Sequence, residues 1–234
     1  MEFMQNDRAV TVGKLAGLIL ALGRSRPVRV AIDGRTASGK TTLADELAVA
    51  IGQAGRPAIR TSVDGFHRPR AERHARGRNS AEGYYLDARD LGAIRALLLD
   101  PLGPGGTGLY RTASFDLERD CAIEQVPLRA ATDSILIVDG TFLQRPELND
   151  GWDVTVFVDT SEGVAEQRGV GRDAARLGGA EAARELYANR YRPAFAMYER
   201  ACRPLSSADA VVENEDLARP RLQVRPGGRL HVMR

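Results

Sequence analysis

Residues 34–42 read GRTASGKTT and fit the pattern G-x-x-x-x-G-K-[ST]. Residues 28–33 (VRVAID) are apolar enough to form a buried strand, and residues 42–52 (TLADELAVAIG) have the apolar spacing of a helix. A glycine-rich turn between a strand and a helix lets successive backbone N–H groups point at an anion, and the helix start adds partial positive charge. This order of elements predicts a P-loop that binds a nucleoside triphosphate.

Residues of the predicted P-loop have expected roles in binding phosphate and metal. Lys40 is long enough to reach the β- and γ-phosphates, and the Thr41 hydroxyl is a suitable ligand for Mg²⁺. We therefore expect ATP as co-substrate and Mg²⁺ as cofactor. The residues predicted to surround the phosphates are Gly34, Ala37, Ser38, Gly39, Lys40, Thr41 and Thr42.

Length and composition limit the class of protein. The chain has 234 residues, 43% of them apolar, and a net charge of +2, which suits one globular α/β domain and does not indicate nucleic-acid binding. Cys121 and Cys202 fit no metal-binding spacing and no disulfide framework, and no run approaches the roughly 18 apolar residues of a membrane span. We expect a cytoplasmic protein with no membrane or nucleic-acid partner.

The order of elements predicts a three-layer P-loop fold, with a mostly parallel sheet and helices on both faces. Residues 1–27 are interpreted as an N-terminal helix (7–22) and linker, residues 160–180 as an arginine-rich lid, and residues 219–234 as the C-terminal part, with a β-hairpin over 221–232. Further strands are expected at 58–63, 134–140, 154–159 and 208–213, and a strand with a turn at 110–117.

Two acidic residues follow predicted strands, and ligands in such folds bind at the carboxyl ends of the strands. Asp64 is a candidate to accept a proton from an attacking hydroxyl or to help hold Mg²⁺, although an Asp-Gly pair also serves as a simple turn. Asp139 ends the apolar run 134–139, and the P-loop upstream favours a role in binding Mg²⁺.

The segment that follows Asp64 is the candidate acceptor region. Phe66 and His67 either form a wall for the acceptor or pack the loop, and the charged residues 68–83 are better explained as a solvated surface loop than as a phosphate site. Asp87 is predicted to cap a helix over residues 88–99.

The predicted lid carries three arginines at intervals of four, which places them on one face of a helix. Guanidinium groups in that arrangement suit phosphate binding, although a solvated face paired to acidic neighbours has the same pattern. The residues are Arg168, Arg172 and Arg176. Glycines between and after these arginines would let the lid move. A long helix over 180–202, with a kink at Pro193, is expected to follow.

Taken in order, the P-loop, Asp64-Gly-Phe, the strand-ending Asp139 and the Arg-x-x-x-Arg-Asp lid resemble the uridine kinase family, which is related to phosphoribulokinase and bacterial pantothenate kinase. The resemblance runs from about residue 28 to residue 214, where RPAFAMYERACRPLSSADAVVEN is similar to the end of uridine kinases. It implies that Asp64 is the general base, and that Lys40 and the lid arginines Arg168 and Arg172 assist phosphoryl transfer, with Arg176 on the triphosphate. Asp139 stands where the family usually has glutamate, and Asp64, Asp139 and Thr41 are the implied metal-binding residues.

The acceptor region departs from the family pattern. The family's Phe-Asp pair, whose aspartate grips the ribose hydroxyls, is absent: residues 83–88 read GYYLDA, which puts Tyr84 at that position. The segment around Tyr110 lacks the histidine that reads uracil. The residues expected to contact the acceptor are Phe66, His67, Tyr84, Tyr85 and Asp87.

The sequence thus predicts an ATP- and Mg²⁺-dependent kinase for a hydroxyl of a small acceptor, a nucleoside such as uridine or cytidine being the first candidate. Alternatives are a kinase for another small alcohol, such as pantothenate or a sugar, and a non-catalytic ATP-binding regulatory protein; homo-oligomer formation is left open. A GTPase is disfavoured because its guanine-reading Asn-Lys-x-Asp is missing, the only lysines being Lys14 and Lys40.

Overall fold

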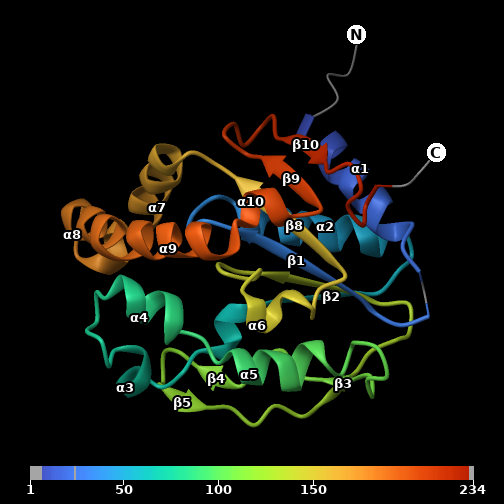
Figure 1. Ribbon diagram of the computed structural model, residues 1–234, viewed down its shortest axis with the longest axis horizontal. Helices are drawn as coiled ribbons and strands as arrows, with labels where there is room; N and C mark the ends of the chain where they lie inside the picture. The colour runs from blue at the N-terminus through green and yellow to red at the C-terminus, as the bar shows by residue number, and fades with distance from the viewer. Residues whose placement is uncertain (1–6, 24, 232–234) are drawn as a thin grey trace.

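The computed structural model describes residues 7–23 and 25–231, and a six-stranded sheet forms its centre (Figure 1). The strand order is β10-β9-β8-β1-β7-β2, and all neighbours are parallel except β10, which is antiparallel to β9. The bounds are Val28–Gly34 (β1), Ala58–Ser62 (β2), Ile135–Asp139 (β7), Val154–Asp159 (β8), Ala210–Glu213 (β9) and Arg221–Val224 (β10).

Helices cover both faces of this sheet, as expected for the predicted three-layer fold. Val30 and Ile32 of β1 pack with α1 and α2 on one face, whereas Ala31 between them faces a second core with α5 and α6. The helix bounds are Asp7–Leu20 (α1), Lys40–Gln53 (α2), Arg70–Arg73 (α3), Ala81–Leu86 (α4), Leu91–Ile94 (α5), Pro146–Asn149 (α6), Glu162–Leu177 (α7), Ala180–Leu186 (α8), Arg192–Cys202 (α9) and Pro204–Ser207 (α10).

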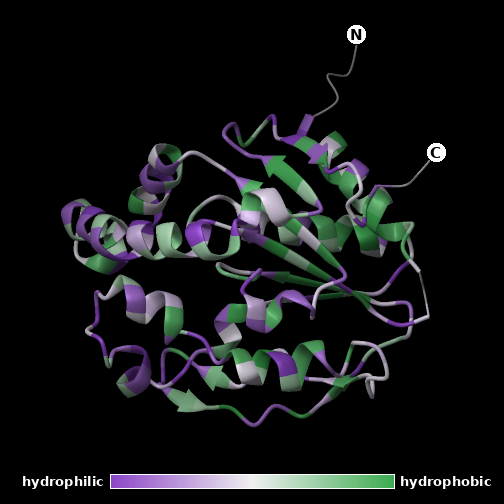
Figure 2. Cartoon of the chain, viewed as in Figure 1, coloured by the Kyte–Doolittle hydropathy of each residue, from purple (hydrophilic) through white to green (hydrophobic). Residues whose placement is uncertain are grey.

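The sheet is the most apolar part of the ribbon, and the outer surfaces of the helices carry the hydrophilic residues (Figure 2). Two small antiparallel sheets lie outside it and consist of Leu109–Tyr110 (β3) with Leu128–Arg129 (β6), and Phe115–Asp116 (β4) with Cys121–Ala122 (β5). Among the described residues, no helix combines the length and apolar character needed to cross a membrane.

The predicted helix over 88–99 is wrong in its first turn. Asp87 ends α4, and it is the Asp90 side chain that caps α5 by accepting a hydrogen bond of 2.8 Å from the Ala93 amide. Arg89 forms an isolated antiparallel bridge with His67, which holds this stretch extended. Helix α5 then continues as a π-helical segment, Arg95–Leu99. The chain therefore starts its helix only after the bridge is complete.

The predicted long helix over 180–202 is interrupted by a π-helical segment, Tyr187–Tyr191. Pro193 follows in the first turn of α9, and its ring has no N–H and clashes with the carbonyl four residues earlier in a regular α-helix. A wider turn before the proline removes that clash, so the kink predicted at Pro193 takes the form of a π-bulge.

The C-terminal hairpin forms with a different partner from the one predicted. Residues 221–224 pair with β9, from Arg221 opposite Glu213 to Val224 opposite Ala210. The expected second arm after the Pro-Gly-Gly turn is not a strand as far as His231, and residues 232–234 lie outside the described residues. Pairing with β9 extends the main sheet, which a hairpin made by the tail alone would not do.

Candidate active site

The P-loop closes tightly at the end of β1, and α2 begins at Lys40. Gly34 and Gly39 have φ angles of +150° and +96°, and a Cβ on them would come within 2.6 Å of the Val158 carbonyl oxygen and 2.4 Å of the Asn214 side-chain nitrogen. Ala37 also has positive φ, at +64°. Both glycines are thus required by conformation and by space. Ser38 is buried, whereas Thr41 and Thr42 are exposed at the start of α2.

The Lys40 ammonium lies across this loop and donates a hydrogen bond of 2.7 Å to the Arg35 carbonyl. Burial lowers the pKa of Lys40 to about 8, although the nearby carboxylates of Asp33, Asp139 and Asp64 act in the opposite direction. Three acidic groups therefore surround the one lysine of the loop, at the carboxyl ends of β1, β7 and β2.

Asp139 and Thr41 meet beside the loop, as the metal prediction requires. The Thr41 hydroxyl donates a hydrogen bond of 2.6 Å to one carboxylate oxygen of Asp139, and the Arg60 guanidinium contacts the other oxygen at 2.7 Å. A hydroxyl and a carboxylate are hard oxygen ligands, and Mg²⁺ is commonly bound by one or two carboxylates together with substrate phosphates. The described residues hold no group of three or more metal-binding side chains, so phosphates and water would have to complete the coordination. The donor set fits Mg²⁺ on those terms.

Asp64 forms a close unit with Arg89 and His67. The Arg89 guanidinium contacts the Asp64 carboxylate at 2.6 Å and the His67 Nε2 at 2.6 Å, while the His67 Nδ1 lies 2.8 Å from the Asp64 carbonyl. Burial and the charge of Arg89 lower the pKa of His67 to about 4, so the ring is neutral and accepts from Arg89 at Nε2. Burial raises the pKa of Asp64, but Arg89 outweighs it and holds that pKa below its ordinary value. Asp64 is therefore an ionised carboxylate.

The three arginines of the predicted lid, which lie on α7, do not converge on one point. Arg168 donates hydrogen bonds of 3.0 and 2.8 Å to the Asn214 and Glu215 carbonyls beside the P-loop, whereas Arg172 is paired with Asp173 at 2.9 Å. Arg176 contacts the same aspartate at 3.6 Å. Arg172 lies close enough to the P-loop for its charge to lower the pKa of Lys40.

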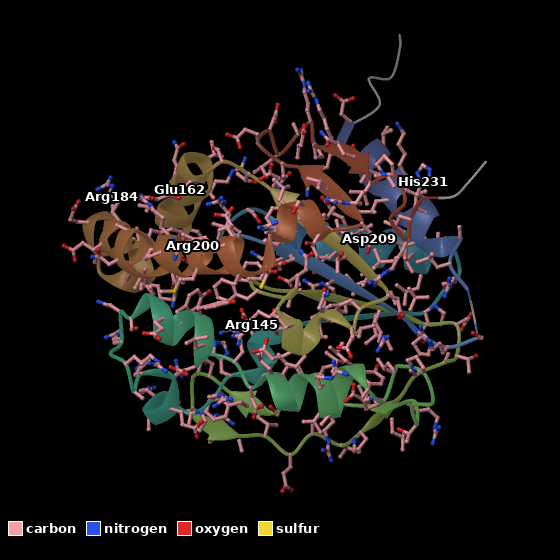
Figure 3. The ribbon with its side chains drawn as sticks, in the orientation of Figure 1. Arg145, Glu162, Arg184, Arg200, Asp209 and His231 are labelled. Carbon is pink, nitrogen blue, oxygen red and sulfur yellow. The ribbon has the colours of Figure 1, made fainter. Side chains whose placement is uncertain are left out.

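The predicted acceptor residues are spread over different environments. Phe66 is fully buried in the core, so it packs the loop and cannot touch an acceptor, whereas Tyr84 stacks edge-on against Phe142 at 5.4 Å. The Arg145 guanidinium lies over the Tyr85 ring, 4.8 Å from the ring centroid, between α4 and α6 (Figure 3). Asp87 forms an ion pair with the exposed Arg76.

Several polar residues at the carboxyl edge of the sheet were not predicted from the sequence. Asp33 is completely buried beneath the P-loop, where it accepts hydrogen bonds from the Gly34 amide at 2.8 Å, from the Gln144 side chain at 3.0 Å and from the Tyr198 hydroxyl. Its position at the end of a strand, which drew attention to Asp139, is the signal that would have found it. No such signal marked the guanidinium groups of Arg60, Arg89 and Arg190, because each acts through residues distant in sequence.

Comparison with known proteins supports the predicted family and fold. The family model for the phosphoribulokinase / uridine kinase family matches residues 29–217. A possible uridine kinase from Bacillus stearothermophilus has a similar structure, with a TM-score of 0.68, 24% identity, and coverage of 86% of this chain and 97% of that one. A D-glycerate 3-kinase from Cryptococcus neoformans has a TM-score of 0.51 and 15% identity, covering 79% of this chain and 87% of that one. No curated protein matches the sequence. The chain, with a P-loop after β1, a strand-end acid on the neighbouring β7 and a family match over most of its length, belongs to the phosphoribulokinase / uridine kinase family.

Proposed function

We propose that this protein is a kinase that uses ATP and Mg²⁺ to phosphorylate a hydroxyl group of a small molecule. The observation that carries the proposal is the placement of Asp64, which directly follows β2 at the same edge of the parallel sheet as Lys40 of the P-loop, so that the two charges interact. A phosphate cradle and an ionised carboxylate at one sheet edge are the donor half and the acceptor half of a phosphoryl-transfer site.

In the proposed reaction, the acceptor oxygen attacks the γ-phosphorus, the bond from that phosphorus to the β–γ bridging oxygen breaks, and ADP leaves. Asp64 orients the hydroxyl and takes its proton. Lys40 and the backbone amides of the P-loop bind the phosphates, and Arg172 offsets charge on the transferred group. Thr41 and Asp139 would hold Mg²⁺, which neutralises phosphate charge when bound.

The decisive experiment measures ADP release with candidate hydroxyl acceptors, including uridine, cytidine, pantothenate and sugars. Asp64→Asn is expected to reduce turnover at least about a hundredfold, the usual contribution of a general base, while ATP binding stays close to normal. Lys40→Ala is expected to lose both.

Matched variants separate these effects from general damage. Lys14→Ala changes the other lysine of the chain, which is exposed on α1, and Asp150→Asn changes an exposed carboxylate paired with Arg95. Both should behave like the unmodified protein. Normal turnover in Asp64→Asn would sink the base assignment. ATP binding with no acceptor-dependent ADP release would favour an ATP-binding regulatory protein.

A further inference from the structure

A cationic cavity is lined by Arg190, whose guanidinium lies over the ring of Tyr84, one of the predicted acceptor residues. Its volume is about 670 Å³, and it lies between α3, the loop that follows it, the end of α7 and the segment from α8 to Tyr191. Glu185 is the one acidic residue among the described residues that line it. Its basic lining residues are Arg70, Arg73, His74, Arg78, Arg176 and Arg190. The walls therefore carry an excess of positive charge, which Asp120 and Asp173 offset in part by pairing with Arg70, Arg73 and Arg176.

Arg190 is the more buried of the two lining arginines, Arg78 and Arg190, that have no ion pair among the described residues. Its guanidinium lies 4.8 Å from the Tyr84 ring centroid and 5.8 Å from that of Tyr191, and its Nε is buried without a hydrogen-bond partner. Within the described residues, no carboxylate lies at ion-pair distance from it. Burial and the like charges of Arg89 and Arg73 lower its pKa. A cation in this setting is costly unless an anion accompanies it.

The neighbouring arginines have partners but retain unused donors. Arg73 contacts Asp120 at 3.2 Å and Arg89 contacts Asp64 at 2.6 Å, yet the Nε of each is buried without a hydrogen-bond partner. Arg190 interacts electrostatically with both. The positive charge thus extends from the cavity to Arg89, which forms an ion pair with the proposed base, Asp64.

On the basis of the proposed kinase function, we propose that the acceptor is an anionic hydroxyl compound, whose phosphate or carboxylate binds Arg190 together with Arg73. Guanidinium groups bind such oxyanions through paired hydrogen bonds. With the anion in this cavity, the rest of a small acceptor extends towards Arg89 and Asp64. A neutral nucleoside would leave the half-buried Arg190 charge without a counter-ion. The charge pattern also accounts for the loss of the ribose-gripping aspartate at Tyr84, because an acidic residue under Arg190 would compete with the ligand.

The test compares acceptors that share their hydroxyl groups and differ in charge. Binding to the full chain is measured by calorimetry for ribose and ribose 5-phosphate, and for glycerol, D-glycerate and glycerol 3-phosphate. We expect the anionic member of each set to bind at least about tenfold more tightly, and the preferred anion distinguishes phosphate from carboxylate recognition. Arg190→Gln should weaken binding of that anion by about tenfold or more, and Arg190→Lys should recover part of it.

Arg184→Gln is the matched control, because Arg184 lies at the outer end of α8 (Figure 3) and is not among the cavity-lining residues. It should leave anion binding unchanged. Melting temperatures show whether Arg190→Gln is folded, and its binding of ATP shows that the donor half is intact. Equal affinity for neutral and anionic members, or unchanged affinity in Arg190→Gln, would overturn the inference.

ADP release separates this inference from the proposed function. If uridine supports ADP release at the same rate in Arg190→Gln as in the unmodified protein, the chain is a kinase but the anionic acceptor is wrong. If no compound supports ADP release while Arg190-dependent anion binding persists, the kinase proposal fails and the anion site stands.

Discussion

The Tyr198 hydroxyl donates a hydrogen bond to the Asp33 carboxylate, although the two residues are 165 positions apart. Tyr198 lies on α9, and Asp33 precedes the first glycine of the P-loop. The same hydroxyl accepts a hydrogen bond of 2.9 Å from the Gln144 amide, and the Gln144 side chain donates to Asp33 at 3.0 Å. Helix α9, the segment after β7 and the start of the P-loop are thereby joined through one buried carboxylate.

Tyr198→Phe is expected to destabilise the protein by about 1–3 kcal/mol. The buried Asp33 carboxylate loses a hydrogen-bond donor, and the backbone amide of Gln144 loses its acceptor. The KM for ATP should also rise, since Asp33 accepts from the Gly34 amide of the P-loop. Urea unfolding and steady-state kinetics measure the two effects. Tyr110→Phe is the control, because Tyr110 is also a buried residue and the described residues offer no hydrogen-bond partner for its hydroxyl. Equal destabilisation by both variants would show that ring packing, not the hydrogen bond, is involved.

ATP affinity is expected to depend on the protonation of Lys40. Its pKa is about 8 in the free protein, because burial disfavours the ammonium. Bound triphosphate would favour the charged form and raise that pKa, so binding requires a proton to be taken up above pH 8. The Kd for ATP should therefore rise by up to about tenfold per pH unit between pH 8 and 9.5.

The matched variant for this pH effect is Lys40→Arg, whose guanidinium stays protonated throughout the range. Calorimetric Kd values from pH 7.5 to 9.5 provide the comparison. A Kd that changes equally with pH in the unmodified protein and in Lys40→Arg would assign the dependence to another group.

Removal of divalent metal with EDTA is expected to abolish ADP release, and added Mg²⁺ should restore it. Asp139→Asn should raise the Mg²⁺ concentration needed for half-maximal rate by at least about tenfold, because the neutral amide replaces a carboxylate next to Thr41. Asp45→Asn removes the other carboxylate that contacts Arg60 and serves as the control. The same Mg²⁺ requirement in all three proteins would exclude Asp139 from metal binding.

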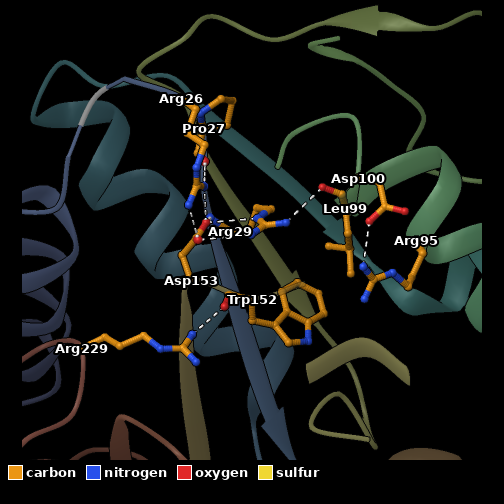
Figure 4. A network of polar contacts seen from close by, with 9 residues as sticks. All are labelled: Arg26, Pro27, Arg29, Arg95, Leu99, Asp100, Trp152, Asp153 and Arg229. Carbon is orange, nitrogen blue, oxygen red and sulfur yellow. Dashed lines mark hydrogen bonds and ion pairs between the residues drawn. The ribbon is translucent and has the colours of Figure 1, made fainter. Parts of the chain in front are cut away.

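Asp153 stabilises the end of the sheet opposite the candidate active site. It contacts Arg26 at 2.6 Å and the buried Arg29 at 3.1 Å (Figure 4). Asp153→Asn should lower the free energy of unfolding by about 2 kcal/mol, because Arg29 keeps its buried charge without a counter-ion. Denaturant unfolding measures the loss, and Asp150→Asn, which affects an exposed pair, should change little.

The pH dependence of stability has a definite sign for this group. Burial alone would raise the pKa of Asp153, but hydrogen bonds from Arg26 and Arg29 hold it well below its ordinary value. Its stabilising contribution is therefore complete above the ordinary range of an aspartate and decreases as the pH falls below it. The difference in stability between the unmodified protein and Asp153→Asn should shrink from pH 6 to pH 3. A constant difference over that range would show that the charge of Asp153 is unimportant.

The donor half of the site could be predicted from the sequence because its residues are close together in the chain or directly follow strands. The P-loop spans nine consecutive positions, and Asp139 ends an apolar run that could only be a buried strand. The acceptor half could not be predicted in the same way. Phe66 carries the right pattern for a pocket wall but is buried, and Asp87 has the right type for a helix cap but ends the preceding helix.

The sequence by itself determined the P-loop, the strand before it, the helix after it and the family, because these depend on short-range periodicity and on glycines with special conformations. Only the tertiary structure placed Asp64 against Arg89, Asp33 against Tyr198, and Arg190 in a cavity of like charge. The physical reason is that charge pairing depends on distance in space. Arginine is common throughout this chain, so the pattern alone could not tell which guanidinium groups have a carboxylate partner and which remain available for a ligand.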